Sequence, residues 1–239
     1  MIKEVINKLN NELPATVRLV AVSKFHPFES IQEAYEAGQR VFAESRPQEL
    51  IAKVKLLDEI RAERGDAEYM SDIEWHFIGH LQTNKLKMVL PYVSMVQSVD
   101  SVRLLDAIQA WGAANDKVIS VLLEPHVAAE ETKQGFDAEE IYEILSRTMT
   151  SSDLQVSTYQ NIRFRGIMGM ATFTDDQSVV ASDFAALRWI FDTCRSRFPY
   201  LSTDFTELSI GMSDDYPLAI EYGSTMIRIG SMIFGERNY

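Results

Sequence analysis

The chain has 239 residues, of which 46% are hydrophobic and 24% are charged, a composition typical of a globular protein with a sizeable core. Its formal net charge of −12 argues against nucleic acid and against an anionic membrane surface as partners, because both call for a basic face. The single Cys194 indicates a reducing compartment, and the sequence shows neither a signal peptide nor an apolar run near the roughly 20 residues of a membrane span, so we expect a cytoplasmic protein.

Short apolar runs typical of strands alternate with segments of helical periodicity along the chain. The predicted strands cover 17–23, 40–43, 74–79, 93–98, 117–124, 163–169, 205–210 and 226–230. The predicted helices cover 2–12, 28–38, 46–64, 83–90, 101–115, 137–149, 177–197 and 214–222. Eight such strands predict an α/β fold, a single (β/α)8 TIM-type barrel domain over residues 1–239 with an extra N-terminal helix. A doubly wound open sheet is the alternative, although no GxGxxG turn follows the first strand.

Several helix ends carry capping signals. Ser45 and Gln48, with a proline between them, predict a capping box at the third helix. Asp100 and Asp137 are predicted to accept hydrogen bonds from the first backbone amides of the helices that follow them. Gly38 is expected to end its helix in the left-handed conformation.

Lys24 ends the first apolar run. Strand alternation places it on the same face as Val20 and Val22, at the carboxyl end of the strand. Partial burial of a lysine favours its neutral amine, which can attack an aldehyde to form a Schiff base. From position alone, the favoured alternative is a lysine at a strand end that extends its charged group into water.

The loops after the last two strands are candidate phosphate sites, because barrels of this type usually hold phosphate there, at a helix N-terminus. Strand seven leads into Gly211 and Ser213, and strand eight leads into Gly230 and Ser231. The alternative is that both glycines are turn residues and that Ser213 is a helix N-cap. The aspartates at 214–215 would repel a phosphate, so we expect them to point outward.

Arg228 lies within an apolar strand, where a permanent cation needs a partner. One alternative is a salt bridge to a barrel carboxylate such as Glu207, and the other is donation to the ring nitrogen of a ligand. Barrel closure would place strand eight beside strand one, so that Lys24 and Arg228 share one mouth. An amine, a fixed cation and an anion cradle suit a phosphorylated aldehyde cofactor.

His76 and His80 are four residues apart, a spacing that would suit a metal pair on a helix. On the predicted strand this spacing spans about 13 Å, too far for one zinc ion with ligand bonds of about 2 Å. We therefore predict no metal site, and we expect both histidines at the barrel mouth.

Four segments together carry a resemblance to a known family. They are Val20–Lys24, His76–Lys85, Leu208–Asp215 and Gly223–Gly235. In order and spacing the chain resembles the pyridoxal phosphate homeostasis proteins, whose fold is related to the barrel domain of alanine racemase. The resemblance implies that Lys24 carries pyridoxal 5'-phosphate as a Schiff base and that Arg228 faces the pyridine nitrogen. It also implies that the phosphate is held by Ser209, Ser213, Gly230 and Ser231.

The chain departs from the family pattern at two places. Ser45 stands where a customary asparagine lies near the cofactor, and strand five ends in His126 in place of an asparagine. Lys133 matches a second family lysine, and an exposed loop lysine is the alternative interpretation of it.

Two functions fit such a site. Racemisation needs an acid or base on each face of the substrate carbon, and Lys24 serves only one face. In the racemase the opposing tyrosine comes from a second domain, for which a chain that ends at Tyr239 leaves no room. We therefore expect a pyridoxal phosphate-binding protein that buffers the cofactor, or delivers it to apo-enzymes, as a monomer or weak dimer. An amino-acid racemase or related pyridoxal phosphate enzyme is the alternative.

Overall fold

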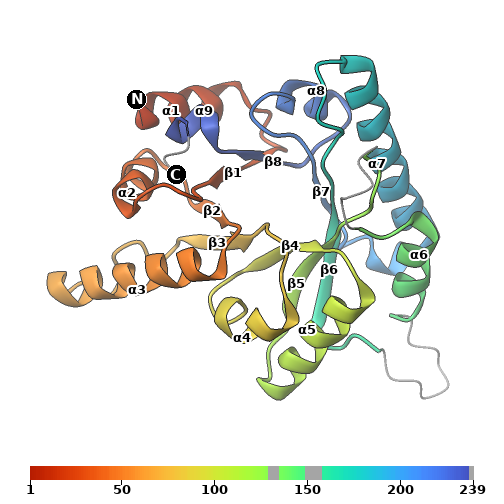
Figure 1. The fold of residues 1–239 in the computed structure, drawn as a ribbon, viewed down its shortest axis with the longest axis horizontal. Helices are drawn as coiled ribbons and strands as arrows, with labels where there is room; N and C mark the ends of the chain where they lie inside the picture. The colour runs from red at the N-terminus through yellow and green to blue at the C-terminus, as the bar shows by residue number, and fades with distance from the viewer. Residues whose placement is uncertain (129–134, 149–157, 237–239) are drawn as a thin grey trace.

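Eight parallel strands close into a barrel within residues 1–128, 135–148 and 158–236, which are the residues that the computed structural model describes (Figure 1). Neighbours in the chain are neighbours in the barrel, and β8 pairs with β1 with Val20 opposite Arg228. The predicted (β/α)8 fold is confirmed, and the open-sheet alternative is wrong because this pairing leaves no edge. The strands are β1 (Arg18–Val22), β2 (Val41–Glu44), β3 (Glu74–Phe77), β4 (Met95–Val99), β5 (Ile119–Leu123), β6 (Ile162–Met168), β7 (Glu207–Ser209) and β8 (Met226–Ile229).

Helices surround the barrel, and each predicted helix is present in some form (Figure 1). The extra N-terminal helix α1 lies beside the last helix, so the two ends of the described chain meet. The short elements η2 and α9 were not predicted. The helical elements are α1 (Ile2–Glu12), α2 (Phe28–Glu36), α3 (Pro47–Arg64), η1 (Thr83–Lys85), α4 (Leu86–Val89), α5 (Val102–Ala114), α6 (Ala138–Ser146), α7 (Gln177–Arg197), η2 (Pro199–Leu201), α8 (Tyr216–Glu221) and α9 (Ser231–Phe234).

The strands separate two apolar cores. Residues of alternate parity point to opposite faces of a strand, so one set fills the barrel and the other packs under the helices. The large outer core includes Leu19, Ala21 and Phe42 and extends beneath the helices all around the barrel. The smaller interior core consists of Val20, Val22, Val41, Ala43, Met95, Leu122, Met168 and Met226.

Two of the predicted helix caps are confirmed. Asp137 and Glu140 form a capping box at α6, with backbone-to-carboxylate distances of 2.8 and 2.9 Å. Gly38 has a φ of +99° just after α2, and its N–H donates to the carbonyl of Tyr35. Both ends therefore follow local sequence chemistry.

Two other predicted caps are wrong. At α3 the N-cap is Arg46 without a side-chain hydrogen bond, so Ser45 forms no capping box, although Pro47 occupies the first turn as predicted. At α5 the cap is the hydroxyl of Ser101, which accepts from the N–H of Leu104, and not Asp100. In both cases the helix begins one residue later than the motif indicates.

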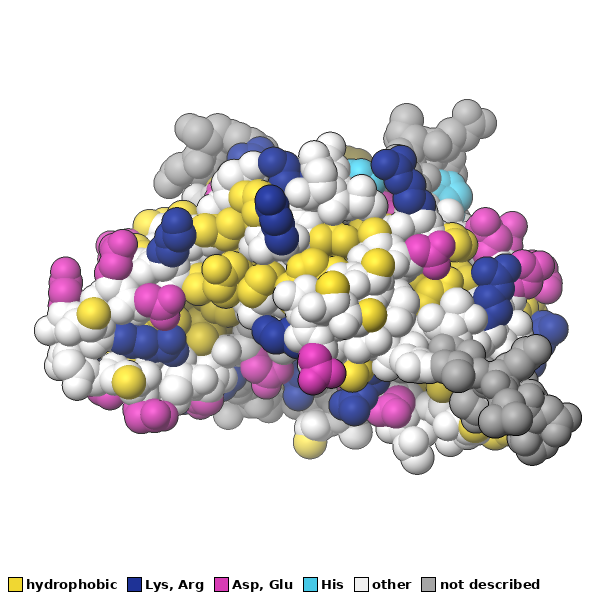
Figure 2. Space-filling model, turned by 90° about the horizontal axis from the view of Figure 1, so that it is seen from below, with side chains coloured by type: hydrophobic (Ala, Val, Ile, Leu, Met, Phe, Trp, Pro, Cys, Tyr) yellow, Lys and Arg dark blue, Asp and Glu magenta, His cyan; other side chains and the backbone are white. Residues whose placement is uncertain are grey.

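The surface carries charges of both signs. On the face drawn in Figure 2, lysine and arginine side chains alternate with aspartate and glutamate side chains, and hydrophobic side chains lie across the middle. Of the helices that the structure describes, not one combines the length and apolar character that crossing a membrane requires.

Candidate functional site at the carboxyl ends of the strands

Lys24 follows the end of β1 on the rim where the parallel strands terminate, and its side chain is half-buried. Because β1 pairs with β8, Lys24 lies four residues beyond Val20, the partner of Arg228. This offset corresponds to about 13 Å along the strand direction. Lys24 therefore lies at the rim, and Arg228 lies deeper in the barrel on the neighbouring strand.

Arg228 is almost fully buried, with 4% of its surface exposed. Its Nη1 donates to the carbonyl and the hydroxyl oxygen of Ser209 at 2.7 and 2.8 Å, and its Nη2 donates to the carbonyl of Gly169 at 2.9 Å. Burial lowers its pKa to about 10, while the charges of Glu124 and Asp215 act in the opposite direction. The Nε–H and one Nη2–H donate to no other described residue, so the cation keeps two donors for a ligand.

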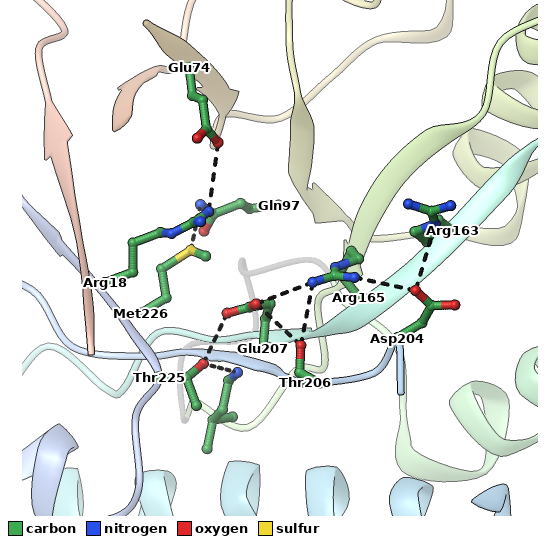
Figure 3. Close-up of polar contacts among 11 residues, drawn as sticks. Arg18, Glu74, Gln97, Arg163, Arg165, Asp204, Thr206, Glu207, Thr225 and Met226 are labelled. Carbon is green, nitrogen blue, oxygen red and sulfur yellow. Dashed lines mark hydrogen bonds and ion pairs between the residues drawn. The ribbon is translucent and has the colours of Figure 1, made fainter. Parts of the chain in front are cut away.

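The salt bridge between Arg228 and Glu207, one of the two alternatives, is not formed. Glu207 begins β7 at the opposite end of the barrel, where its carboxylate lies 3.5 Å from Nη2 of Arg165 and accepts a hydrogen bond from Thr225 (Figure 3). The buried guanidinium of Arg228 instead donates hydrogen bonds to the backbone carbonyls of Ser209 and Gly169, which are acceptors without a negative charge.

A chain of hydrogen bonds crosses the interior of the barrel from Arg228 to His76; we call its four members, His76, Gln97, Ser209 and Arg228, the interior chain. The hydroxyl of Ser209 donates to Oε1 of Gln97 at 2.7 Å. Nε2 of Gln97 contacts Nδ1 of His76 at 2.8 Å and the sulfur of Met226 at 3.2 Å, the second of which is drawn in Figure 3. Every link thus has a donor and an acceptor.

His76 lies inside the barrel with 1% of its surface exposed, so the prediction that it lies at the mouth is wrong. Burial, and to a smaller extent the charge of Arg18, lowers the pKa of His76 to about 3. The imidazole is therefore neutral at physiological pH, and its Nδ1 accepts from Gln97. His80 is mostly exposed and contacts Asp100 at 2.9 Å. The described residues contain no cluster that could hold a metal ion.

The predicted phosphate residues occupy two levels. Ser213 is half-buried in the turn before α8, Gly230 is the half-buried N-cap of α9, and Ser231 is the exposed first residue of that helix. Ser209 lies deeper, without exposed surface, and its hydroxyl already serves the interior chain. A Cβ at Gly230 would lie 3.2 Å from the carbonyl oxygen of Val22, so this position leaves little room for a side chain.

The two aspartates after Ser213 differ in their orientation. Asp214 is exposed, as expected, but Asp215 is half-buried and its carboxylate accepts from the N–H of Met212 at 2.5 Å. Burial raises the pKa of Asp215, while the Met212 amide and the charge of Arg228 lower it. The expectation that both carboxylates point outward is therefore wrong for Asp215, which holds the loop that follows β7.

The two residues that depart from the family pattern lie after β2 and after β5. Ser45 is half-buried just after β2, and its backbone packs so closely that a Cβ at Gly79 would lie 2.1 Å from the Ser45 carbonyl oxygen. His126 is exposed after β5, and its N–H donates to the carbonyl of Phe136 at 2.9 Å. Lys133 lies outside the described residues.

Comparison with known proteins places this arrangement in a family. The family model for the alanine racemase N-terminal domain matches residues 1–238. A pyridoxal phosphate homeostasis protein of Vibrio alginolyticus is 35% identical over 228 residues, covering 95% of this chain and 89% of the relative. A protein of the same name from Aquifex aeolicus is 35% identical over 93% of this chain and 88% of its own length. The chain belongs to the pyridoxal phosphate homeostasis protein family.

Solved structures agree with this assignment. PipY of Synechococcus elongatus, solved with pyridoxal phosphate bound, is 34% identical and covers 98% of this chain and 100% of its own, with a TM-score of 0.82. Alanine racemase from E. faecalis is 17% identical with a TM-score of 0.65, and this chain covers 57% of its length. The second likeness shows a shared fold alone.

Proposed function

We propose that this chain binds pyridoxal 5'-phosphate through Lys24 and acts in cofactor homeostasis, by buffering the cofactor or delivering it to apo-enzymes. The observation that carries the proposal is the pairing of β1 with β8, which sets the end of the strand before Lys24 beside Arg228 and the loop at Gly230. The names of the relatives and the bound cofactor in PipY support it. A monomer or weak dimer in the cytoplasm, with residues 1–239 as one binding domain, is part of the same proposal.

The residues at the mouth fit the cofactor. The two N–H groups of Arg228 that no other described residue accepts are available to an aromatic ring nitrogen. Because Arg228 keeps its proton at neutral pH, a ring nitrogen that accepts from it would stay unprotonated. The chain after β8 passes close to β1, because a Cβ at Gly230 would lie 3.2 Å from the Val22 carbonyl oxygen, and backbone amides there with the hydroxyls of Ser213 and Ser231 would meet the phosphate.

The bound cofactor would supply an aldehyde, and Lys24 would supply the amine. Lys24 would hold the group by condensation of its Nζ with that aldehyde carbon, with the aldehyde oxygen lost as one molecule of water. No oxidant or further reactant is required. Ser45 lies close enough in the fold, at the end of the neighbouring strand β2, to contribute to the same mouth.

The test is a titration of purified protein with pyridoxal phosphate, followed by borohydride reduction and peptide mapping. We expect a visible absorbance band and a reduced adduct on Lys24, both lost in Lys24→Ala and retained in Lys55→Ala, which changes an exposed lysine of α3. An equal band in Lys24→Ala would remove the assignment. Incubation of the loaded protein with L- and D-amino acids tests the racemase alternative, and sustained racemisation would overturn the buffering function.

A further inference from the structure

A buried polar cluster lies directly behind Lys24, on the outer side of the barrel wall. It consists of Ser23, Glu44 and Lys53, which we call the brace, with 0%, 0% and 7% of their surfaces exposed. Ser23 and Glu44 face the helices, because their strand neighbours Val22 and Ala43 belong to the interior core. Lys53 reaches them from α3. The brace is therefore separate from the mouth of the barrel.

Each member of the brace contacts the other two. Nζ of Lys53 donates to the carbonyl of Ser23 at 2.8 Å and to Oε1 of Glu44 at 2.6 Å. The hydroxyl of Ser23 donates to the same Oε1 at 2.6 Å. Ser23 is the residue directly before Lys24, so Lys53 of α3 holds the backbone carbonyl of this residue and Glu44 of β2 holds its hydroxyl.

The residue after Lys24 is held as well. Phe25 has a φ of +68°, a conformation that is unfavourable for a bulky residue and that persists only where neighbours enforce it. Its N–H donates to Oε2 of Glu49, which also lies on α3, at 3.3 Å. The α3 helix thus fixes the backbone on both sides of Lys24, through Lys53 before it and Glu49 after it.

Two features of the brace do not favour the stability of the fold. Oε2 of Glu44 is buried and has no hydrogen-bond partner among the described residues, and burial raises the pKa of Glu44 to about 7 against the lowering effect of Lys53. Buried ion pairs of this kind are often no more stable than well-packed apolar residues. Lys53 also interrupts an otherwise apolar stripe, between buried Leu50 and Leu57. A role other than stabilising the fold would account for the unpaired oxygen of Glu44 and for the buried Lys53.

We propose that Lys53 is a positioning residue for Lys24: by holding the Ser23 carbonyl and the Glu44 carboxylate, it fixes the direction in which the Lys24 amine leaves the end of β1. This inference rests on the proposed function, because the amine is positioned for the aldehyde of pyridoxal phosphate. An amine whose backbone is fixed in advance loses less conformational freedom when the cofactor binds.

The test compares Lys53→Met, the double variant Glu44→Met/Lys53→Met, and the control Lys55→Met, an exposed position on the same helix. Three quantities are measured: urea unfolding, the dissociation constant for pyridoxal phosphate, and the reactivity of Lys24 in the cofactor-free protein. Trace acetic anhydride with peptide mass spectrometry reports that reactivity. We expect Lys53→Met to be destabilised and to bind the cofactor at least about tenfold more weakly. The double variant should regain stability, because no buried charge stays unpaired, but not affinity.

The outcomes separate the two proposals. Affinity and Lys24 reactivity of the double variant within about twofold of the wild type would show that Lys53 serves folding only, and would overturn the inference. If the borohydride-reduced adduct of the wild type maps to a residue other than Lys24, the proposed function fails. The labelling of Lys24 by acetic anhydride in the cofactor-free variants still tests whether Lys53 positions Lys24. A change of about threefold or more in the Lys24 reactivity, relative to Lys55→Met, supports the positioning role of Lys53, and an unchanged reactivity overturns it.

Discussion

Gln97 is the central link of the interior chain, and replacing it with methionine tests whether that chain stabilises the barrel. Gln97 has no exposed surface, accepts from Ser209 at 2.7 Å and contacts His76 at 2.8 Å. Methionine has a similar length and fills a similar volume, so the main effect of Gln97→Met is the loss of these hydrogen bonds without a large cavity.

The size of the effect follows from the groups that are left unpaired. Loss of Gln97 leaves the hydroxyl hydrogen of Ser209 and Nδ1 of His76 without partners in a dry interior, at about 2 kcal/mol each. Burial of the apolar methionine side chain offsets about 1 kcal/mol of this. The expected decrease in the free energy of unfolding is therefore about 3 kcal/mol, measured by urea denaturation with intrinsic fluorescence.

Two further variants make this reasoning refutable. Gln177→Met, at an exposed position at the start of α7, should change the stability by no more than about 0.5 kcal/mol. His76→Leu/Gln97→Met should lose about 1–2 kcal/mol less than the sum of the two single variants, because removal of His76 also removes one unpaired acceptor. Equal stability of Gln97→Met and the wild type would show that the interior chain does not contribute, and strict additivity would show that His76 and Gln97 are not coupled.

Three other predictions concern stability and binding. Burial raises the pKa of Glu44 to about 7 in the folded protein, from 4.5 in the unfolded chain. The protonated carboxyl therefore stabilises the fold fully below pH 4.5, and this stabilisation is lost as the pH rises through 7. Urea unfolding at several pH values should show a decrease of about 3 kcal/mol in the free energy of unfolding, which should be absent in Glu44→Gln. Gly79→Ala would bring a Cβ within 2.1 Å of the Ser45 carbonyl oxygen and should destabilise the fold by about 3 kcal/mol, visible as a lower Tm. In Gly230→Ala the added Cβ would lie 3.2 Å from the Val22 carbonyl oxygen, a contact that a small shift can relieve, so the fold should persist. The same Cβ would stand at the proposed phosphate site, so a cofactor titration should show about tenfold weaker binding.

The barrel could be predicted because its signals are local and repeated. Each apolar run of the sequence became a strand, and the alternation with helices leaves few topologies. The boundaries were less accurate where pairing is weak: the run at 205–210 yields only Glu207–Ser209, whose pairing with β8 joins Ser209 to Met226. The α9 helix spans four residues, too few for helical periodicity to appear.

The rim of the candidate site could also be predicted, because each rim residue directly follows an apolar strand. The interior chain could not, since its members come from four different strands; Ser209 and Gln97 are 112 positions apart. A usable signal existed in Gln97 itself, a polar residue with the inward parity of Met95 in a fully buried strand. Lys53 gave a similar signal, because a lysine among core-facing residues of a helix requires a specific partner.

The failed cap at Ser45 shows how tertiary packing overrides a local motif. The capping box would need the Ser45 hydroxyl to accept from the N–H of Gln48, but α3 starts at Pro47 with Arg46 as its N-cap. The backbone of Ser45 packs against Gly79, which has no side chain to keep the two strand ends apart. Barrel closure therefore decides the position of this residue, and the short-range pattern does not.

The guanidinium of Arg228 and the backbone next to Lys24 are held by two polar sets that share no residue. Arg228 is fixed from inside the barrel, by Ser209 and through it Gln97, whereas Lys24 is flanked by backbone that Lys53 fixes from outside. The barrel wall lies between the two sets, so a change in one need not disturb the other. For the proposed buffering function, this separation would allow the depth of Arg228 and the direction of the Lys24 amine to be adjusted independently.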